Sequence, residues 1–188
     1  MDKHEPIARA AEYGRRSMAQ QRYVVFDVET TGLSPVYGDR VIEIGAIAVE
    51  KKQIAGEFHS LVNVGKRIPF PAHQIHGITN DMLTGQPLPE EAFPRFHAFV
   101  GDGILVAHNA RFDVGFLRHE FGRLGLGLSN RYLCTLEMSR RRFPRLRNHK
   151  LETVYRHLFR EPVGAIQQHR ALGDARMVAR VWLEMMKR

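Results

Sequence analysis

Short apolar runs occupy the first part of the chain, and their spacing predicts strands. Residues 23–28 are apolar, β-branched or aromatic at most positions, and this run ends at Thr-Thr-Gly, as expected of a short buried strand. Residues 41–49 and 56–64 predict two more strands, and the short connections between the three favour an antiparallel meander. Residues 103–107 predict a further short buried strand.

Helical periodicity dominates the second half of the chain. Residues 89–100 carry phenylalanines on one side behind a proline in the first turn, and another helix opens after residue 107. The segment 131–143 predicts a helix or a strand–helix pair, residues 149–159 an amphipathic helix, and residues 170–187 the clearest helix of the chain. Strands followed by an alternation of strands and helices indicate a single α/β domain with a mixed sheet.

Two segments fall outside this pattern. Residues 1–21 are polar and basic, and we expect them to form an N-terminal extension, a short helix or loose arm, that precedes a domain of residues 22–188. The Pro69-Phe70-Pro71 sequence is expected to break regular structure, with a loop over residues 75–79 behind it. Thr79 or Asn80 is placed to cap a short helix after that loop.

Two acidic residues interrupt the first predicted strand. Asp27 and Glu29 lie two residues apart, so the alternation of a strand places both side chains on the same side. Burying two like charges together costs free energy unless a cation lies between them. Taken alone, the pair fits a solvated acidic face on an edge strand as well as it fits a cation site.

Further acidic residues occur at helix starts. Asp113 falls in the first turn of the helix after residue 107, where a carboxylate also serves as a partner of the helix dipole. Asp174 lies three residues after Ala171 and four before Val178, on the apolar stripe of the last helix, where a carboxylate needs a partner. His169 precedes the same helix and is either a hydrogen-bonded structural residue or a member of the same pocket.

These residue types together indicate phosphodiester hydrolysis. Four carboxylates from different elements provide only oxygen ligands, which suit two divalent cations such as Mg²⁺ or Mn²⁺ rather than zinc. Two such ions about 4 Å apart can clamp an in-line displacement at phosphorus. A histidine side chain has an ordinary pKa of about 6.5, so this residue type at position 169 is suited to act as the general base for the attacking water.

The charge balance favours a polyanionic partner. The 188 residues include 28 Lys and Arg against 20 Asp and Glu, a net charge of +8. The alternative explanation of this surplus is solubility alone. The arginines of residues 140–147 fit contact with a nucleic-acid backbone or a solvated basic face equally well.

Cysteine content and hydropathy bear on the compartment. The single cysteine, Cys134, excludes an intramolecular disulfide and suits a reducing, cytoplasmic setting. His73 and His76 have the spacing of half a metal site, but no soft ligands complete it. No apolar run is long enough to span a membrane and no signal peptide is visible, so we expect no membrane partner.

Three sequence blocks resemble the exonuclease motifs of the DEDDh 3′–5′ exonucleases, which include the epsilon proofreading subunit of bacterial DNA polymerase III and its stand-alone homologues. They are DVETTGL at 27–33, HNARFD at 108–113 and HRALGD at 169–174, with IHGIT at 75–79 between the first two. The resemblance covers about residues 23–186. It implies a ribonuclease-H-like fold, a five-stranded mixed sheet flanked by helices.

The resemblance also implies a role for each matching residue. Asp27, Glu29 and Asp174 would ligate the first metal ion, and Asp27 would bridge to a second ion held by Asp113 through water. His169 would be the general base. The remaining positions would contact substrate: Thr30, Thr31, Gly32 and Leu33 at the 3′-terminal nucleotide, His76 at its base, and Asn109 and Phe112 at the scissile end. Hydrogen bonding within loops is the alternative role for His76 and Asn109.

The implied activity is 3′–5′ hydrolysis of single-stranded or frayed DNA, with release of nucleoside monophosphates. An exoribonuclease that trims RNA ends is the alternative enzyme, and a non-catalytic module that binds nucleic acid or a polymerase is the alternative from another class. The chain has no tail beyond its last helix comparable to the one by which the epsilon subunit grips its polymerase. We therefore expect a stand-alone exonuclease or a domain of a longer protein, with a DNA polymerase as a second candidate partner beside the nucleic-acid 3′ end.

Overall fold

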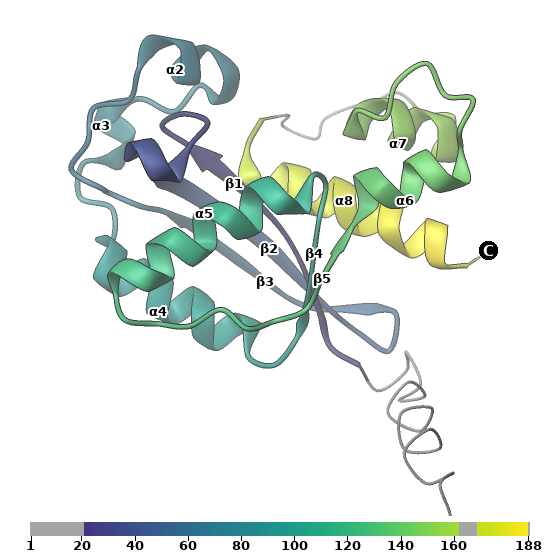
Figure 1. Cartoon of the computed structure of the whole chain (residues 1–188), viewed down its shortest axis with the longest axis horizontal. Helices are drawn as coiled ribbons and strands as arrows, with labels where there is room; N and C mark the ends of the chain where they lie inside the picture. The colour runs from purple at the N-terminus through teal and green to yellow at the C-terminus, as the bar shows by residue number, and fades with distance from the viewer. Residues whose placement is uncertain (1–20, 162–168, 188) are drawn as a thin grey trace, which may run out of the picture.

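A five-stranded sheet forms the centre of the computed structural model, which describes residues 21–161 and 169–187 (Figure 1). The strand order is β3-β2-β1-β4-β5. The β1–β2 and β2–β3 pairs are antiparallel, whereas the β1–β4 and β4–β5 pairs are parallel, so the predicted meander and mixed sheet are both confirmed. The strands are β1 Tyr23–Thr30, β2 Val41–Glu50, β3 Gln53–Leu61, β4 Ile104–Ala107 and β5 Tyr132–Cys134.

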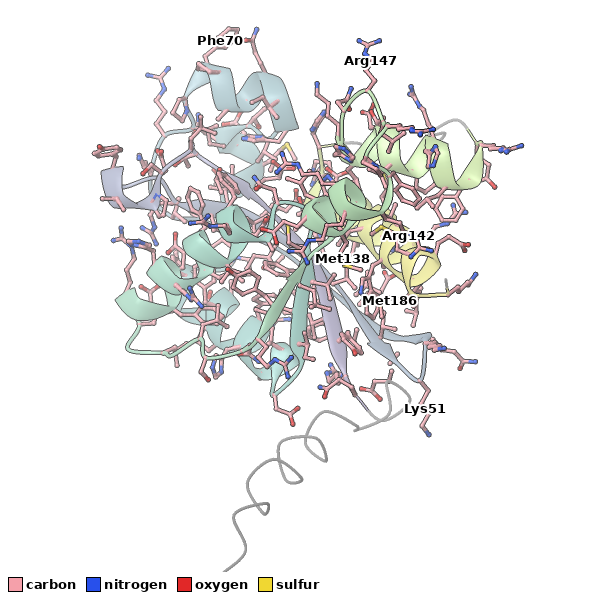
Figure 2. All side chains as sticks on the ribbon, turned by 45° about the vertical axis from the view of Figure 1, so that its right-hand side comes forward. Lys51, Phe70, Met138, Arg142, Arg147 and Met186 are labelled. Atoms are coloured by element: carbon pink, nitrogen blue, oxygen red, sulfur yellow. The ribbon has the colours of Figure 1, made fainter. Side chains whose placement is uncertain are left out.

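β1 lies in the middle of the sheet, between β2 and β4. The alternative that Asp27 and Glu29 lie on the solvated face of an edge strand is therefore wrong. Tyr23 pairs with Val49, so the first residues of β1 lie beside the β2–β3 turn at Lys51. The acidic residues at the other end of β1 consequently lie far from that turn. Figure 2 shows Lys51 at the end of the molecule opposite Phe70 and Arg147.

Helices cover both faces of the sheet. Successive β1 side chains point to opposite sides, and each side carries apolar residues that need to be covered. Val24, Phe26 and Val28 pack in one core with α4 and α5, while Tyr23 and Val25 pack in another with α8. Figure 1 shows α4 and α5 on one side, and α8 with its neighbours α6 and α7 on the other. These helices are α4 Pro89–Val100, α5 Ala110–Arg123, α6 Thr135–Arg142, α7 Leu151–Phe159 and α8 Ala171–Met186.

Several boundaries differ from the sequence expectation. The third strand begins earlier than predicted, at Gln53, because β2 and β3 join through a two-residue turn with a positive φ at both lysines. The Pro69-Phe70-Pro71 sequence does not break regular structure but starts α2 (Phe70–His76). Proline is tolerated in the first helical turn, where the backbone N–H has no intrahelical acceptor. A short 3₁₀ helix, η1 (Pro35–Tyr37), was not predicted.

The short helix after α2 agrees with its prediction. Thr79 caps α3 (Asn80–Leu83), its Oγ1 accepting a hydrogen bond from the Met82 amide at 3.2 Å. The predicted N-terminal extension lies outside the described residues, apart from Gln21. Within the described part of the chain, every helix is too short or too polar to cross a membrane.

Candidate active site

Three of the predicted acidic residues meet at the C-terminal end of β1. Asp27, Glu29 and Asp174 each offer a carboxylate oxygen, and these oxygens all lie within 4.8 Å of one another. The strand alternation directs Asp27 and Glu29 to the face covered by α8, and Asp174 lies in the first turn of that helix. A set of close carboxylate oxygens fits a hard divalent cation such as Mg²⁺ or Mn²⁺.

Asp113 approaches from the other helical layer. It lies in the first turn of α5 and is only 3% exposed, with its carboxylate hydrogen-bonded by the Val28 amide of β1. It is not one of the three mutually close carboxylates. Its charge nevertheless raises the pKa of Asp27, so the two groups share one electrostatic environment.

Burial and mutual repulsion hold protons on this cluster. Desolvation raises the pKa of Asp27 well above its usual range, and the charges of Asp113, Glu29 and Asp174 raise it further. Burial, followed by the neighbouring carboxylates, raises the pKa of Glu29 to about 8. Burial also raises the pKa of Asp113 to about 7 and that of Asp174 to about 6. A cation that binds here must displace these protons and relieves the repulsion among the acids.

We expect Mn²⁺ to stabilise the protein more at pH 8 than at pH 5. The pKa of Glu29 rises from 4.5 to about 8 on folding, so between these values the folded chain binds more protons than the unfolded chain. Stability of the metal-free protein therefore falls as pH rises through this window, while competition between protons and the cation weakens. Thermal unfolding with and without Mn²⁺ measures the effect, and an equal shift in Tm at both pH values would contradict it.

Glu43 is a fifth carboxylate beside this cluster, which the sequence analysis did not identify. It pairs with Glu29 across β1 and β2, and its side chain is 1% exposed. Its Oε1 accepts hydrogen bonds from Arg170 Nη2 at 2.8 Å and lies 2.7 Å from His59 Nε2, while Oε2 accepts from the Ala171 amide at 3.0 Å. Although burial opposes it, these hydrogen bonds lower the pKa of Glu43 to about 2.

The Glu43 carboxylate thus fixes the start of α8. Arg170 and Ala171 lie between His169 and Asp174, so the same contacts position both predicted site residues. The one available sequence signal was an acid inside the apolar run of residues 41–49, because a buried carboxylate requires a partner.

Gly45 allows α8 to approach the sheet at this point. It pairs with Asp27, and a Cβ atom at residue 45 would lie 2.1 Å from the Leu172 nitrogen and 2.2 Å from the Ala171 carbonyl carbon. Both are backbone atoms, so a side chain at residue 45 would displace the first turn of α8. The absence of a side chain here brings Asp174 close to the acids of β1.

His169 is exposed beside the cluster. Its backbone is left-handed (φ 55°), and its amide donates to Asp174 Oδ2 at 3.2 Å. The ring makes no hydrogen bond with any residue that the structure describes, so its nitrogens are open to solvent or substrate. This geometry is compatible with proton transfer from a water at the cluster.

The predicted substrate loop after β1 is internally braced. The Thr30 hydroxyl donates to the Gly32 carbonyl at 2.6 Å, and Thr31 Oγ1 accepts from the Arg40 amide at 3.0 Å. Both threonines are buried, whereas Leu33 is 81% exposed and projects from the loop. Within the predicted contact residues 30–33, Leu33 is therefore the side chain that is available to a ligand.

A second ion pair ties this loop to α5. Arg40 Nε and Nη2 each lie 2.8 Å from the carboxylate oxygens of Glu120, which is 2% exposed. Glu120 also accepts from the Val41 amide at 3.0 Å. Because Glu120 lies two turns after Asp113 on α5, the pair fixes the loop relative to the helix that carries Asp113. The sequence analysis did not identify it either.

The other predicted contact residues occupy different environments. His76 is buried, its Nδ1 accepts from the Ile78 amide at 3.0 Å, and burial lowers its pKa. Asn109 precedes α5 in a left-handed conformation (φ 75°) that leaves its side chain without a capping bond. The Phe112 ring packs against Phe116 at 4.9 Å between centroids. His76 thus supports the loop from within, while Asn109 lies at the junction that leads to Asp113.

Comparison with known sequences identifies one family over almost the whole described domain. The family model described as Exonuclease (RNase_T) matches residues 24–182. The DNA polymerase III PolC-type of Halalkalibacterium halodurans is 40% identical over 171 residues, which are 90% of this chain and 12% of that protein. The PolC-type polymerase of Bacillus subtilis is 37% identical over 189 residues, covering 100% of this chain and 13% of its own length. The chain therefore spans only a small part of these relatives.

Comparison with solved structures gives the same family and fold. Exonuclease X in complex with 5′-overhanging duplex DNA is 27% identical with a TM-score of 0.69, covering 89% of this chain and 92% of that one. Exonuclease I of E. coli, in its zinc-bound complex with single-stranded DNA, has a TM-score of 0.77 at 20% identity over 89% of this chain and 41% of that one. These likenesses confirm the ribonuclease-H-like fold. With its motifs, fold and family match in agreement, the chain belongs to the exonuclease family and is of the DEDDh type.

Proposed function

We propose that the chain is a metal-dependent 3′–5′ exonuclease that removes nucleoside monophosphates from the 3′ end of DNA. The observation that carries this proposal is the convergence of Asp27, Glu29 and Asp174 at the C-terminal end of β1. Their raised pKa values indicate a site that is costly to ionise without a cation. The exposed Leu33 follows the same strand and offers an apolar contact for a terminal base.

The acidic residues divide between two proposed cation sites. Asp27, Glu29 and Asp174 would hold one Mg²⁺ or Mn²⁺, and Asp113, set apart from them, would hold a second ion through water, with Asp27 shared between both. When bound, such ions supply Lewis-acid stabilisation of charge at the phosphate and at the leaving 3′ oxygen. The Glu43 carboxylate is already paired with Arg170, so it positions the start of α8 rather than ligating a cation.

In the proposed reaction, His169 accepts a proton from the attacking water. The water oxygen forms a bond to phosphorus as the bond from phosphorus to the preceding 3′ oxygen breaks, and that oxygen takes a proton from solvent. The products are a nucleoside 5′-monophosphate and a strand shortened by one nucleotide with a free 3′ hydroxyl. The exposed ring of His169, beside Asp174, has the access to water that this role requires.

The substrate end would be held by residues around the cluster. Leu33 would contact the terminal base and Gly32 the adjoining backbone, with Thr30, Thr31 and His76 shaping the loop from beneath. Asn109 and Phe112 would support the scissile end from the start of α5. A DNA substrate is favoured because Exonuclease X, the 27% identical neighbour, was solved with DNA. A DNA polymerase is the proposed protein partner, since the relatives at about 40% identity are PolC-type polymerases.

Single strands of DNA and RNA with the same sequence, labelled at the 5′ or 3′ end, test this proposal. With Mn²⁺, we expect a 3′ label to appear in a mononucleotide at the earliest times and a 5′ label to give a descending ladder on DNA. EDTA should abolish both products. Mononucleotide release from the 5′ end would overturn the polarity, full activity in EDTA would overturn the metal site, and faster cleavage of RNA would reverse the substrate preference.

A further inference from the structure

The end of α6 and the loop that follows it carry a dense set of unpaired positive charges. We call this the α6–α7 basic segment; it contains Arg140, Arg141, Arg142, Arg145, Arg147 and Lys150. All six residues are exposed, and none of their side chains makes an ion pair or hydrogen bond with a described residue. The nearby acids Glu152 and Glu161 are engaged by Arg156 and Arg180. Glu137 is the one acid of α6 itself, so the segment presents a net positive field to solvent.

Partly buried hydrogen bonds hold this segment beside the active site. His108, the residue before Asn109, has Nε2 2.8 Å from the His149 carbonyl and Nδ1 2.9 Å from Thr135 Oγ1. The His149 ring in turn lies 3.1 Å from Ser139 Oγ of α6. Burial lowers the pKa of His108, and a proton on Nε2 donates to the His149 carbonyl. The loop is consequently fixed to the β4–α5 junction from which Asp113 enters the site.

The side chains of the segment extend from the active-site end of the molecule along α6. Figure 2 shows Arg147 projecting from the same end as Phe70, opposite Lys51, with Arg142 farther along the helix. The C-terminal end of β1, which carries Asp27 and Glu29, lies at that same end, away from Lys51. A strand whose 3′ end reaches the carboxylates can therefore continue over Arg147.

A hollow between these arginines adds an aromatic surface. It has a volume of about 470 Å³ and is lined by Arg142, Phe143, Pro144, Arg145, Leu146 and His157. Phe143 and His157 meet edge to face at 4.8 Å, and the Arg142 guanidinium lies 5.9 Å from the Phe143 ring. Cationic side chains beside aromatic rings are the features by which proteins hold single-stranded nucleic acids without reading their sequence.

We propose that the α6–α7 basic segment binds the phosphates of a single strand on the 5′ side of the scissile bond. Clustered carboxylates without bound cations repel a polyanion, and a neighbouring positive surface offsets that repulsion. This proposal rests on the proposed exonuclease function. It extends that function by assigning the part of the chain that holds the strand away from the reacting phosphate.

The test compares two triple variants that remove equal charge. Arg142→Gln, Arg145→Gln and Arg147→Gln neutralise the segment, while Arg95→Gln, Arg118→Gln and Arg123→Gln neutralise exposed arginines of α4 and α5. Binding of a labelled 20-nucleotide DNA strand is measured in EDTA over a range of salt concentrations. We expect the segment variant to raise Kd roughly tenfold at low salt. The slope of log association constant against log salt concentration should become less negative by about 2, since each of the three lost phosphate contacts contributes about 0.7. The control should change neither value appreciably.

A mononucleotide substrate separates this proposal from the proposed function. The nitrophenyl ester of thymidine 5′-monophosphate has no upstream phosphates, so the segment variant should hydrolyse it at the wild-type rate. If the wild type cleaves the ester and the strand but the segment variant binds the strand unchanged, the segment proposal is wrong and the exonuclease stands. If the wild type cleaves neither substrate, the exonuclease proposal fails whatever the binding slopes are. Equal weakening of strand binding by both triple variants would also overturn the segment proposal. So would a segment variant that binds the strand like the wild type but no longer binds anionic vesicles.

Discussion

Replacing Asp27 by asparagine is expected to abolish most strand hydrolysis and, at the same time, to make the metal-free protein more stable. Asp27 lies among four other carboxylates, and burial together with their charges raises its pKa well above the ordinary value of 3.8. Asparagine has nearly the same shape without the charge, so it removes the repulsion. It is also a poorer ligand for a hard cation, and loss of several kcal/mol of metal stabilisation corresponds to a rate loss of roughly 10³-fold or more.

The raised pKa of Asp27 determines how the difference in stability between the two proteins changes with pH. A raised pKa of Asp27 in the folded state means that the wild type loses more stability than the asparagine variant as pH rises above the ordinary value, because the variant lacks this one group. The difference in Tm between the two proteins in EDTA should therefore grow from acidic pH toward pH 8.

The exposed acid Asp102 offers a matched control for Asp27. Asp102→Asn makes the same chemical change at the surface and should alter neither the Tm difference nor the rate. Hydrolysis by Asp27→Asn at close to the wild-type rate would show that Asp27 is not a metal ligand. A lower Tm of the variant at pH 8 would show that the acids are not mutually repulsive.

Local sequence pattern predicted much of the site because three of its acids follow simple periodicities. Asp27 and Glu29 share a face through strand alternation, and Asp174 falls on the stripe that α8 turns toward the sheet. The motif blocks supplied the rest of the list. Pattern did not reveal that β1 is central, because its pairing with β4 joins segments about eighty residues apart and no local signal encodes that neighbour.

Contacts across the fold account for what the sequence analysis missed. Glu43 and Arg170 are 127 positions apart, and Arg40 and Glu120 are 80 apart, yet each pair fixes an element of the site. A glutamate in an apolar strand predicts that a hydrogen-bond or ion-pair partner exists, but it does not identify that partner. Gly45 gave no signal at all, since its meaning lies in the α8 backbone that approaches it.

The contacts at Glu43 and Gly45 serve one geometric purpose. Glu43 binds the backbone and side chain at the start of α8, and Gly45 lets that turn rest directly on β2 beside Asp27. Both act on the distance between Asp174 and the acids of β1. The site is therefore sensitive to a change in β2 that touches none of its proposed ligands.

Gly45→Ala is expected to reduce hydrolysis by about 100-fold or more, the scale of loss that follows a displacement of about 1 Å. Its Cβ would lie 2.1 Å from the Leu172 nitrogen, so α8 must move and carry Asp174 away from Asp27 and Glu29. The stabilisation of the fold by Mn²⁺ should shrink with it, which distinguishes a displaced metal site from simple loss of stability. Overpacking should also lower the free energy of unfolding by about 1–3 kcal/mol.

A second glycine in the same sheet gives the control for this change. Gly56 lies in β3, and a Cβ there would meet only the Phe99 ring, at an ordinary contact distance of 3.8 Å. Gly56→Ala should therefore leave both hydrolysis and the Mn²⁺ effect near their wild-type values. If Gly45→Ala behaved like Gly56→Ala, the close approach of α8 would not set the position of Asp174. If both variants lost activity while Mn²⁺ still stabilised them fully, the sheet rather than the carboxylate cluster would be the sensitive element.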